Sequence, residues 1–295
     1  MHAIANEEKE LAKTINANTL PKGYSKDPSF LNVVYNSMIV RLTIWRRYSA
    51  EAIGSIIQLV VLIAVFYLFA TAVGFRGLAD LGTHGVYIFF LGAMLIMVFD
   101  SVAIYGPVNA MQRDLTNGTL EYLYFTPMNH YGYYLGYIIG TAIVNSLIGF
   151  IPIYIILVWY ANLSVFNALM IIITMFFLIM SLTAMGILIS LSVILFKQVQ
   201  SLLGLIGIVM QFFTGGFIPL VSLPFFIKPI AFFFPHTYAY ELIHYYSFSG
   251  SWSLMLPLVY NWILIVGFTI LYTLLAVVLL RKVVKHAKQK GLHIL

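Results

Sequence analysis

Few residues of this chain could do acid–base or metal chemistry, and two of them stand at a suggestive spacing. Glu241 and His244 are three residues apart, as in the helices that carry di-iron carboxylate centres. Such a centre needs a second copy of the motif and further glutamates, which the sequence does not offer. His236 lies close by without an accompanying cysteine or aspartate, so a zinc site is not expected. We predict no metal site, and interpret Glu241 and His244 as an outward-facing helix end whose polar groups bond one another.

Asp100 is the only acidic residue well inside a long apolar run. It follows Val86 by 14 residues, which on a helix amounts to about 21 Å of a hydrocarbon core about 30 Å thick. An ionisable group at such depth is a candidate functional residue. Either it contacts a substrate or relays a proton, or it has a structural role and hydrogen-bonds the helix end near Tyr105 and Asn109.

The elements that must position these residues are membrane helices. The chain has 295 residues, of which 61% are hydrophobic and only 9% are charged, and its mean hydropathy is +0.95. Soluble domains carry about 25% charged residues, so a soluble fold is excluded. The chain contains no cysteine, which excludes disulfides and thiolate metal sites. The predicted fold class is therefore an all-α polytopic membrane protein.

Six stretches reach the length of about 20 apolar residues that a transmembrane helix needs. They are Ile53–Val73, Val86–Tyr105, Gly132–Tyr160, Val165–Phe196, Leu202–Leu220 and Leu254–Leu280. Six spans place both termini on one side of the membrane. Fourteen Lys and Arg residues fall on that side, against Arg76 and Lys228 on the other. The positive-inside rule makes it the cytoplasmic side, with the protein in the plasma membrane.

The segments that flank the spans are more polar. Residues 1–28 indicate a mobile cytoplasmic tail, and residues 283–295 form a basic cytoplasmic tail that suits anionic lipid rather than nucleic acid. From residue 29 to residue 49, apolar residues recur every three to four positions, at Phe30, Val34, Met38, Leu42 and Trp45. This pattern predicts a helix in the membrane interface; the alternative is a cytosolic extension of the first span.

The stretch between the last two spans, residues 221–253, is too apolar for an aqueous loop. Pro224, Pro229 and Pro235 forbid one straight helix. We predict two short helices that dip into the outer leaflet and return, a re-entrant hairpin packed against protein. Ten of the 25 residues from Pro224 to Phe248 are aromatic, which suits anchoring at the interface, while the tyrosine half suits contact with an amphipathic cargo.

Residues that could line a substrate path come from several spans and from the hairpin. The candidates are Asp100, Tyr105, Gln211, Tyr238 and Tyr245. Isolated polar residues in membrane helices also hydrogen-bond between helices, and this is the alternative role for Gln211.

A polar stretch, residues 109–128, separates the second and third predicted spans. Asp114, Thr116 and Asn117 begin it, a mostly apolar run follows, and Pro127 ends it. A polar start, about two turns of helix and a proline stop predict a small helix that lies outside the membrane.

Two groups of residues resemble ABC-2 type permeases, the membrane subunits of ABC exporters. The first is Gly118-Thr119-Leu120-Glu121 with Thr126-Pro127, which resembles the cytoplasmic loop of that family. The second is Gly215-Gly216-Phe217-Ile218-Pro219, Leu223-Pro224 and Pro235-His236-Thr237-Tyr238-Ala239-Tyr240-Glu241, which resembles the end of the fifth helix and the outer re-entrant hairpin. The resemblance extends from about Ser29 to Lys282. It departs from the family at His244, where an Arg is frequent.

The resemblance implies that the loop docks onto an ATP-hydrolysing partner. The residues it assigns to coupling are Asp114, Asn117, Gly118, Thr119, Leu120, Glu121, Thr126 and Pro127, and those it assigns to the hairpin are Pro219, Pro224, Pro235 and Glu241. The chain has no Gly-Lys pair and hence no P-loop, so ATP and Mg²⁺ would bind the partner and this chain would be neither an enzyme nor a cofactor protein. The implied partners are a pair of ABC ATPase subunits, a second copy or a paralogous permease, and membrane lipid, with no nucleic acid.

The expected function is therefore that of the permease subunit of an ATP-driven exporter, which moves a drug-like, lipid or lipid-linked glycan substrate out of the cell. Two alternatives remain. An intramembrane lipid-modifying enzyme needs clustered His, Asp or Arg residues near the interface, and a proton-coupled carrier would use Asp100. A neighbouring gene for a P-loop ATPase would favour the exporter.

Overall fold

The computed structural model describes residues 28–290 except residues 48, 73–77, 79–80, 120–122, 124, 127, 197–206 and 208–209. Over the described residues the chain is helical. The α-helices are α2 (Phe30–Arg47), α3 (Ser49–Ala72), α4 (Gly82–Ala103), α5 (Tyr105–Thr116), α7 (His130–Asn145), α8 (Ile151–Tyr160), α9 (Val165–Phe196), α11 (Lys228–Ala231), α12 (Pro235–Ser247) and α13 (Leu258–Lys290). A π-helical turn, η3, covers Ser146–Phe150, and a 3₁₀ turn, η4, covers Leu220–Ser222.

Five helical runs in the described part of the chain are long and apolar enough to cross a membrane. They are Ile53–Thr71, Gly82–Thr116, His130–Tyr160, Val165–Leu191 and Leu258–Val283. These runs correspond to the first four predicted spans and to the sixth. The predicted fifth span, Leu202–Leu220, falls largely outside the described residues. The chain is a multi-pass membrane protein because five such helices cannot be accommodated in a soluble core of this size.

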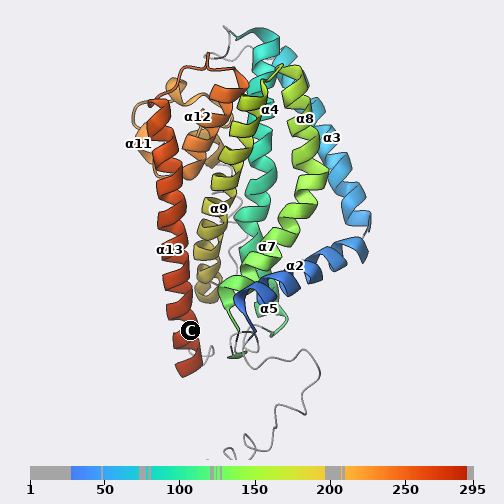
Figure 1. Cartoon of the computed structure of the whole chain (residues 1–295), viewed down its shortest axis with the longest axis vertical. Helices are drawn as coiled ribbons and strands as arrows, with labels where there is room; N and C mark the ends of the chain where they lie inside the picture. Colours follow the sequence, from blue (N-terminus) through green and yellow to red (C-terminus); the bar gives the residue numbers. More distant parts are fainter. Residues whose placement is uncertain are drawn as a thin grey trace, which may run out of the picture.

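The helices form one elongated bundle, and different helices lie at its two ends (Figure 1). Helix α2 runs nearly across the bundle axis at the same end as α5, and α13 also ends there. Helices α11 and α12 lie towards the opposite end. The predicted N-terminal tail lies outside the described residues up to residue 27, whereas the predicted basic tail from residue 283 continues α13 as helix to Lys290.

Helix α4 is the core of the bundle. Of its most apolar stretch 88% is buried, against 17–33% for the other four runs, whose apolar side chains face outward. Side chains on every side of α4 are inaccessible, among them Phe89, Leu91 and Leu95. A helix that is apolar all round is stable only when it is enclosed, and in this bundle α3, α7, α8, α9 and α12 all contact α4.

The run from α4 into α5 is interrupted near a proline. Pro107 has no N–H to donate to the carbonyl oxygen of Ala103, and Ile104 lies between the two helices as a turn residue. Gly186 of α9 packs directly against this junction: a Cβ at Gly186 would contact Ala103 O and would lie 2.8 Å from Ile104 O. The junction is thus a kink with an identifiable cause, supported by a close helix approach.

Helix α2 packs along α7 through a stripe of glycines spaced four residues apart. A Cβ at Gly136 would contact Val34 O, and one at Gly140 would lie 2.9 Å from Met38 O. At Gly132 it would lie 3.0 Å from the ring of Phe30. The missing side chains let the two backbones approach closely, as small residues do between membrane helices.

The apolar stripe that predicted an interfacial helix over residues 29–49 coincides with α2. The structure shows, however, that Val34, Met38 and Leu42 of this stripe are half-buried, on the face that packs on α7. The exposed apolar residues of α2 are Phe30, at the start of the stripe, and Leu31, Tyr35, Ile39 and Val40. The stripe therefore meets protein. The four-residue spacing of the glycines in α7 is the sequence signal from which this packing could have been predicted.

Replacement of Gly136 tests the close approach. In Gly136→Ala, the added methyl group collides with the backbone of Val34, so we expect a loss of about 1–3 kcal/mol of stability and a lower melting temperature in detergent. Gly54→Ala in α3, where a Cβ meets nothing within 4 Å, is the matched control and should leave the melting temperature unchanged or slightly raised. Equal melting temperatures for the two variants would contradict the packing.

Candidate functional site

The loop that follows α5 begins with a rigid turn. Gly118 has a φ of +69°, and its N–H donates to Leu115 O at 3.1 Å, while the N–H of Thr119 donates to Asp114 O at 2.9 Å. These two bonds are those of a Schellman motif, in which a glycine with positive φ ends the helix and satisfies its last carbonyls. Only glycine takes this conformation at no steric cost, which explains why the helix stops here.

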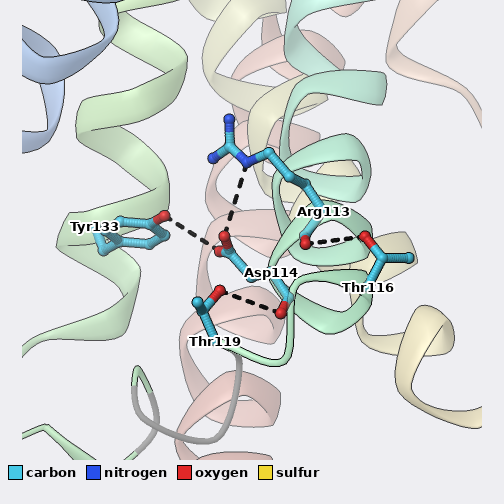
Figure 2. Close-up of polar contacts among 5 residues, drawn as sticks. All are labelled: Arg113, Asp114, Thr116, Thr119 and Tyr133. Atoms are coloured by element: carbon cyan, nitrogen blue, oxygen red, sulfur yellow. Dashed lines mark hydrogen bonds and ion pairs between the residues drawn. The ribbon is translucent and has the colours of Figure 1, made fainter.

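The side chain of Asp114 ties the end of α5 to α7 (Figure 2). Asp114 is only 7% exposed, and its Oδ2 accepts a hydrogen bond from the hydroxyl of Tyr133 at 3.2 Å. Arg113 Nε lies 3.8 Å from Asp114 Oδ1. Figure 2 also shows the hydroxyls of Thr116 and Thr119 donating to the carbonyl oxygens of Arg113 and Asp114. The last turn of α5 is therefore held in place by side chains as well as by the backbone.

Tyr137 of α7 joins α5 to α2. The guanidinium carbon of Arg113 lies 5.3 Å from the centre of the Tyr137 ring, and that of Arg41 on α2 lies 5.5 Å from it. Arg41 Nε also donates to Thr141 Oγ1 at 3.1 Å. Cation–π contacts at these distances are each worth about 0.5–1 kcal/mol where they are exposed. Three helices that are distant in the sequence thus meet at the start of the loop.

The far end of the loop is anchored on α7. The side chain of Asn129 accepts a hydrogen bond from the N–H of Gly132 at 3.1 Å and so caps the first turn of α7. His130 Nε2 lies 3.0 Å from Leu123 O, and the N–H of Leu123 donates to Thr119 O at 3.0 Å, as in a helical turn. Both ends of the loop therefore rest on α7.

The coupling residues predicted from the sequence divide into three groups. Asn117, Gly118, Thr119 and Thr126 are exposed, whereas Asp114 is buried and faces α7. The expectation that Asp114, Thr116 and Asn117 begin a small helix is wrong, because they end α5. The remaining predicted coupling residues, Leu120, Glu121 and Pro127, lie outside the described residues.

Asp100 has a partner that sequence reasoning did not consider. Its Oδ1 lies 3.0 Å from Nε2 of His236, the second residue of α12, and both side chains are buried. The sequence analysis considered a hydrogen bond to the helix end near Tyr105 and Asn109, and found no aspartate near His236. The two residues are 136 positions apart, so their proximity is a product of the tertiary structure alone.

Glu241 and His244 are fastened to other elements and not to one another. Glu241 Oε2 accepts a hydrogen bond from the N–H of Met255 at 2.7 Å, and His244 Nε2 lies 3.1 Å from Phe89 O on α4. Both side chains are buried, so the prediction of an outward-facing helix end is wrong. Within α12, which is not one of the spanning helices, burial lowers the pKa of His244 to about 3 and raises the pKa of Glu241. His244 is therefore neutral and donates its proton to Phe89 O.

The remaining substrate-path candidates are distributed over several elements. The hydroxyl of Tyr105 lies against Gly207, so that even a Cβ at Gly207 would collide with it. Tyr238 is buried, donates to Phe232 O at 2.6 Å and stacks on Phe268 of α13. The backbone carbonyl of Gln211 accepts hydrogen bonds from the N–H groups of Gly216 and Phe217, and Tyr245 is half-buried beside Gly250. The predicted hairpin residues Pro219 and Pro235 are buried and Pro224 is exposed.

A comparison with protein families decides what kind of membrane protein this is. The family profile of the ABC-2 type transporter matches residues 32–248, from α2 to the end of α12. The chain belongs to the ABC-2 type transporter family. It is thus a membrane permease domain, a non-catalytic subunit whose nucleotide is bound by a separate ATPase subunit. No curated protein matches the chain. Among the described residues, no group of three or more His, Cys, Asp or Glu side chains could bind a metal ion.

The buried histidine of α12 gives a pH-dependent prediction. His244 stays neutral in the folded chain because its pKa is about 3, whereas it gains a proton below about 6.5 when unfolded. Its contribution to stability is full above pH 6.5 and falls as the pH drops, by up to about 1.4 kcal/mol per unit. Between pH 7.5 and pH 5, the melting temperature in detergent should fall less steeply in His244→Gln, which keeps a donor for Phe89. The exposed His84→Gln is the control, and an unchanged slope in His244→Gln would contradict the assignment.

Proposed function

We propose that this chain is the permease subunit of an ATP-driven exporter, and that the exposed turn at Asn117–Thr119 and the loop beyond it receive the ATPase. The observation that carries the proposal is the way in which side chains hold the end of α5, where the loop begins. An exposed turn stands on a helix end that is locked to α2 and α7 by Asp114, Tyr133 and Tyr137. A partner that presses on such a turn moves helices, because the turn itself cannot yield.

Coupling in this proposal is mechanical. Two ATPase subunits close on ATP and displace the loops of two permease copies, or of one copy and a paralogue. The loop residues that lie outside the described part of the chain, Leu120, Glu121 and Pro127, belong to the same docking surface. Because α5 follows α4 in the helical run Gly82–Thr116, displacement of the loop acts at the junction of α5 with the core helix.

Two features support a six-span topology with the missing span between α9 and α13. Helix α9 and helix α13 lie side by side, and the hydroxyl of Thr269 on α13 donates to Phe177 O on α9 at 3.0 Å. Thr269 and Phe177 are each about three turns from the start of their helix, and Ala184 of α9 and Ala276 of α13 share one buried cluster further along both. The two helices therefore run in the same direction. Two parallel neighbours need a return crossing between them, which falls within the predicted span Leu202–Leu220.

The contacts of α12 support a re-entrant hairpin. His236, near the start of α12, meets Asp100 near the end of α4, while Phe248, just beyond α12, lies against Gly85 near the start of α4. Helix α12 therefore runs antiparallel to α4 along about four of its turns. A re-entrant hairpin requires a segment that enters the membrane to the depth of Asp100 and then runs back beside α4. In this proposal the hairpin reaches deeper than the outer leaflet.

The orientation and the cargo complete the proposal. The end of the bundle that carries α2, α5 and the end of α13 is the cytoplasmic one, since the arginines and lysines of these helices gather there. Both termini are then cytoplasmic and the protein lies in the plasma membrane. The exported substrate is an amphiphile such as a drug-like molecule, a lipid or a lipid-linked glycan.

The docking turn can be tested against a matched glycine. Gly118 and Gly82 both have positive φ, at +69° and +61°, and neither would place a Cβ within 4 Å of another atom. Gly118→Ala and Gly82→Ala therefore carry similar backbone strain of about 1–2 kcal/mol, at opposite ends of one helical run. With the co-purified ATPase, Gly118→Ala should reduce permease-stimulated ATP turnover roughly fivefold or more, whereas Gly82→Ala should not. Glu121→Ala should act like Gly118→Ala, and transport without any ATPase partner would refute the proposal.

The orientation can be tested in this cysteine-free chain with single cysteines. Cysteines at Thr83, Asn162 or Ser249 should react with a membrane-impermeant maleimide from outside intact cells, whereas those at Asn117 or Lys288 should react only after permeabilisation. Labelling of Asn117→Cys in intact cells would reverse the orientation and remove the docking loop from the cytoplasm.

A further inference from the structure

We propose that α4 and α12 move as one rigid unit, clamped at its deep end by Asp100 and His236, and that the bending which accompanies transport is confined to the junction between α4 and α5. This inference rests on the proposed function, because it says which parts of the permease move against one another when the docking loop is displaced. The hairpin segment, residues 221–253, is then carried by α4 and is not a gate that swings by itself.

The contacts between α4 and α12 extend over the whole length of α12. At one end, a Cβ at Gly85 would lie 3.5 Å from Phe248; in the middle, one at Gly92 would lie 3.2 Å from both Ile243 and His244. The ring of His244 stacks on Phe89 at 4.2 Å and its Nε2 bonds Phe89 O. Twelve of the 13 residues of α12 are buried. A helix enclosed in this way cannot slide or swing without breaking a close-packed interface.

The deep end of α12 is held differently, by a polar pair. Asp100 Oδ1 and His236 Nε2 are 3.0 Å apart, with side chains that are 9% and 0% exposed. This contact joins the carboxyl group of α4 to an imidazole of α12. Buried groups of this kind bond strongly when paired and are costly to separate, so the pair fixes the position of the start of α12 relative to α4.

Two further polar atoms close to the pair are buried as well. His236 Nδ1 and the hydroxyl of Tyr240, one turn further along α12, are buried and have no hydrogen-bond partner among the described residues. A Cβ at Gly216, which precedes the hairpin segment, would lie 2.8 Å from that hydroxyl, so the polar groups around the pair are tightly enclosed.

In this proposal the bend lies at the junction between α4 and α5, immediately beyond Asp100. The carbonyl oxygen of Ala103 lacks its helical donor because of Pro107, and Gly186 lets α9 touch the backbone of this junction. Within the run Gly82–Thr116, this junction is therefore the place where a change of angle breaks the fewest internal hydrogen bonds. Helix α5 and its loop can thus rotate against the unit of α4 and α12.

Paired spin labels distinguish a rigid unit from an independent hairpin. The labels are attached to cysteines introduced at Thr83, before the first buried turns of α4, and at Ser249, just beyond α12; a second pair uses Thr83 and Asn117, which lie on opposite sides of the junction. Complexes with the ATPase carry one labelled and one unlabelled permease copy. On trapping with ATP, Mg²⁺ and vanadate, the Thr83–Asn117 distance should change by about 2 Å or more, while the Thr83–Ser249 distance stays the same.

A Thr83–Ser249 distance that changes as much as the other would overturn the rigid unit, and a Thr83–Asn117 distance that stays constant would overturn the hinge. Neither result bears on docking, which co-purification of the complex reports separately.

The role of the Asp100–His236 pair is tested in the permease alone, without the ATPase. Asp100→Asn should broaden the Thr83–Ser249 distance distribution, whereas Asp114→Asn, the same change on the far side of the junction, should not. His236→Gln should broaden it as Asp100→Asn does, and the double variant should be no broader than either single variant. Should Asp100→Asn fail to fold, His236→Gln carries the test. A distribution unchanged in both single variants, or additive broadening in the double variant, would show that Asp100 and His236 do not act as a pair.

Discussion

Burial of α4 on nearly every side is the constraint on which the rest of this structure depends. In a membrane, most helices can turn an apolar face to lipid, but an enclosed helix must find a protein partner for each of its faces and for each polar group it carries. Here α9 touches the end of α4 through Gly186, Gly149 of the π-turn η3 meets Val98, and α12 covers the side that carries Phe89 and Asp100. The bundle is built outward from this one helix.

In the function proposed above, the same helix links this chain, which is a non-catalytic subunit, to an ATP-driven process. The loop after α5 stands on the continuation of α4, so a force on the loop acts on the centre of the bundle rather than on its edge. Asp114, Tyr133 and Tyr137 prevent the end of α5 from unwinding under such a force, and Arg41 extends the connection to α2. Each of these contacts is weak by itself, but together they join the three helices α2, α5 and α7 at one place.

Much of the fold could be predicted from the amino-acid sequence, because hydrophobic length is a local property. The predicted span Val165–Phe196 coincides with α9, and the other observed spans differ from their predictions mainly at the ends. The boundary of α5 is also readable in principle, because Gly118 after a polar helix end is the usual sign of a helix C-terminus. The polar residues Asp114, Thr116 and Asn117 therefore end a helix and do not begin one. Proline spacing correctly divided the hairpin segment into two short helices, α11 and α12.

The sequence by itself determined which segments enter the membrane, where prolines and glycines end helices, and which family the loop and hairpin residues resemble. Only the tertiary structure decided that Asp100 faces His236, that Glu241 and His244 bond Met255 and Phe89, and that the apolar stripe of α2 faces the glycines of α7. The reason is physical. In a soluble protein, the hydrophobic side of a helix is the side that faces the core. Lipid is as apolar as a protein interior, so the sequence of a membrane helix does not indicate which of its sides faces protein. Which faces meet is then settled by close packing and by the few polar pairs, and these depend on all the helices at once.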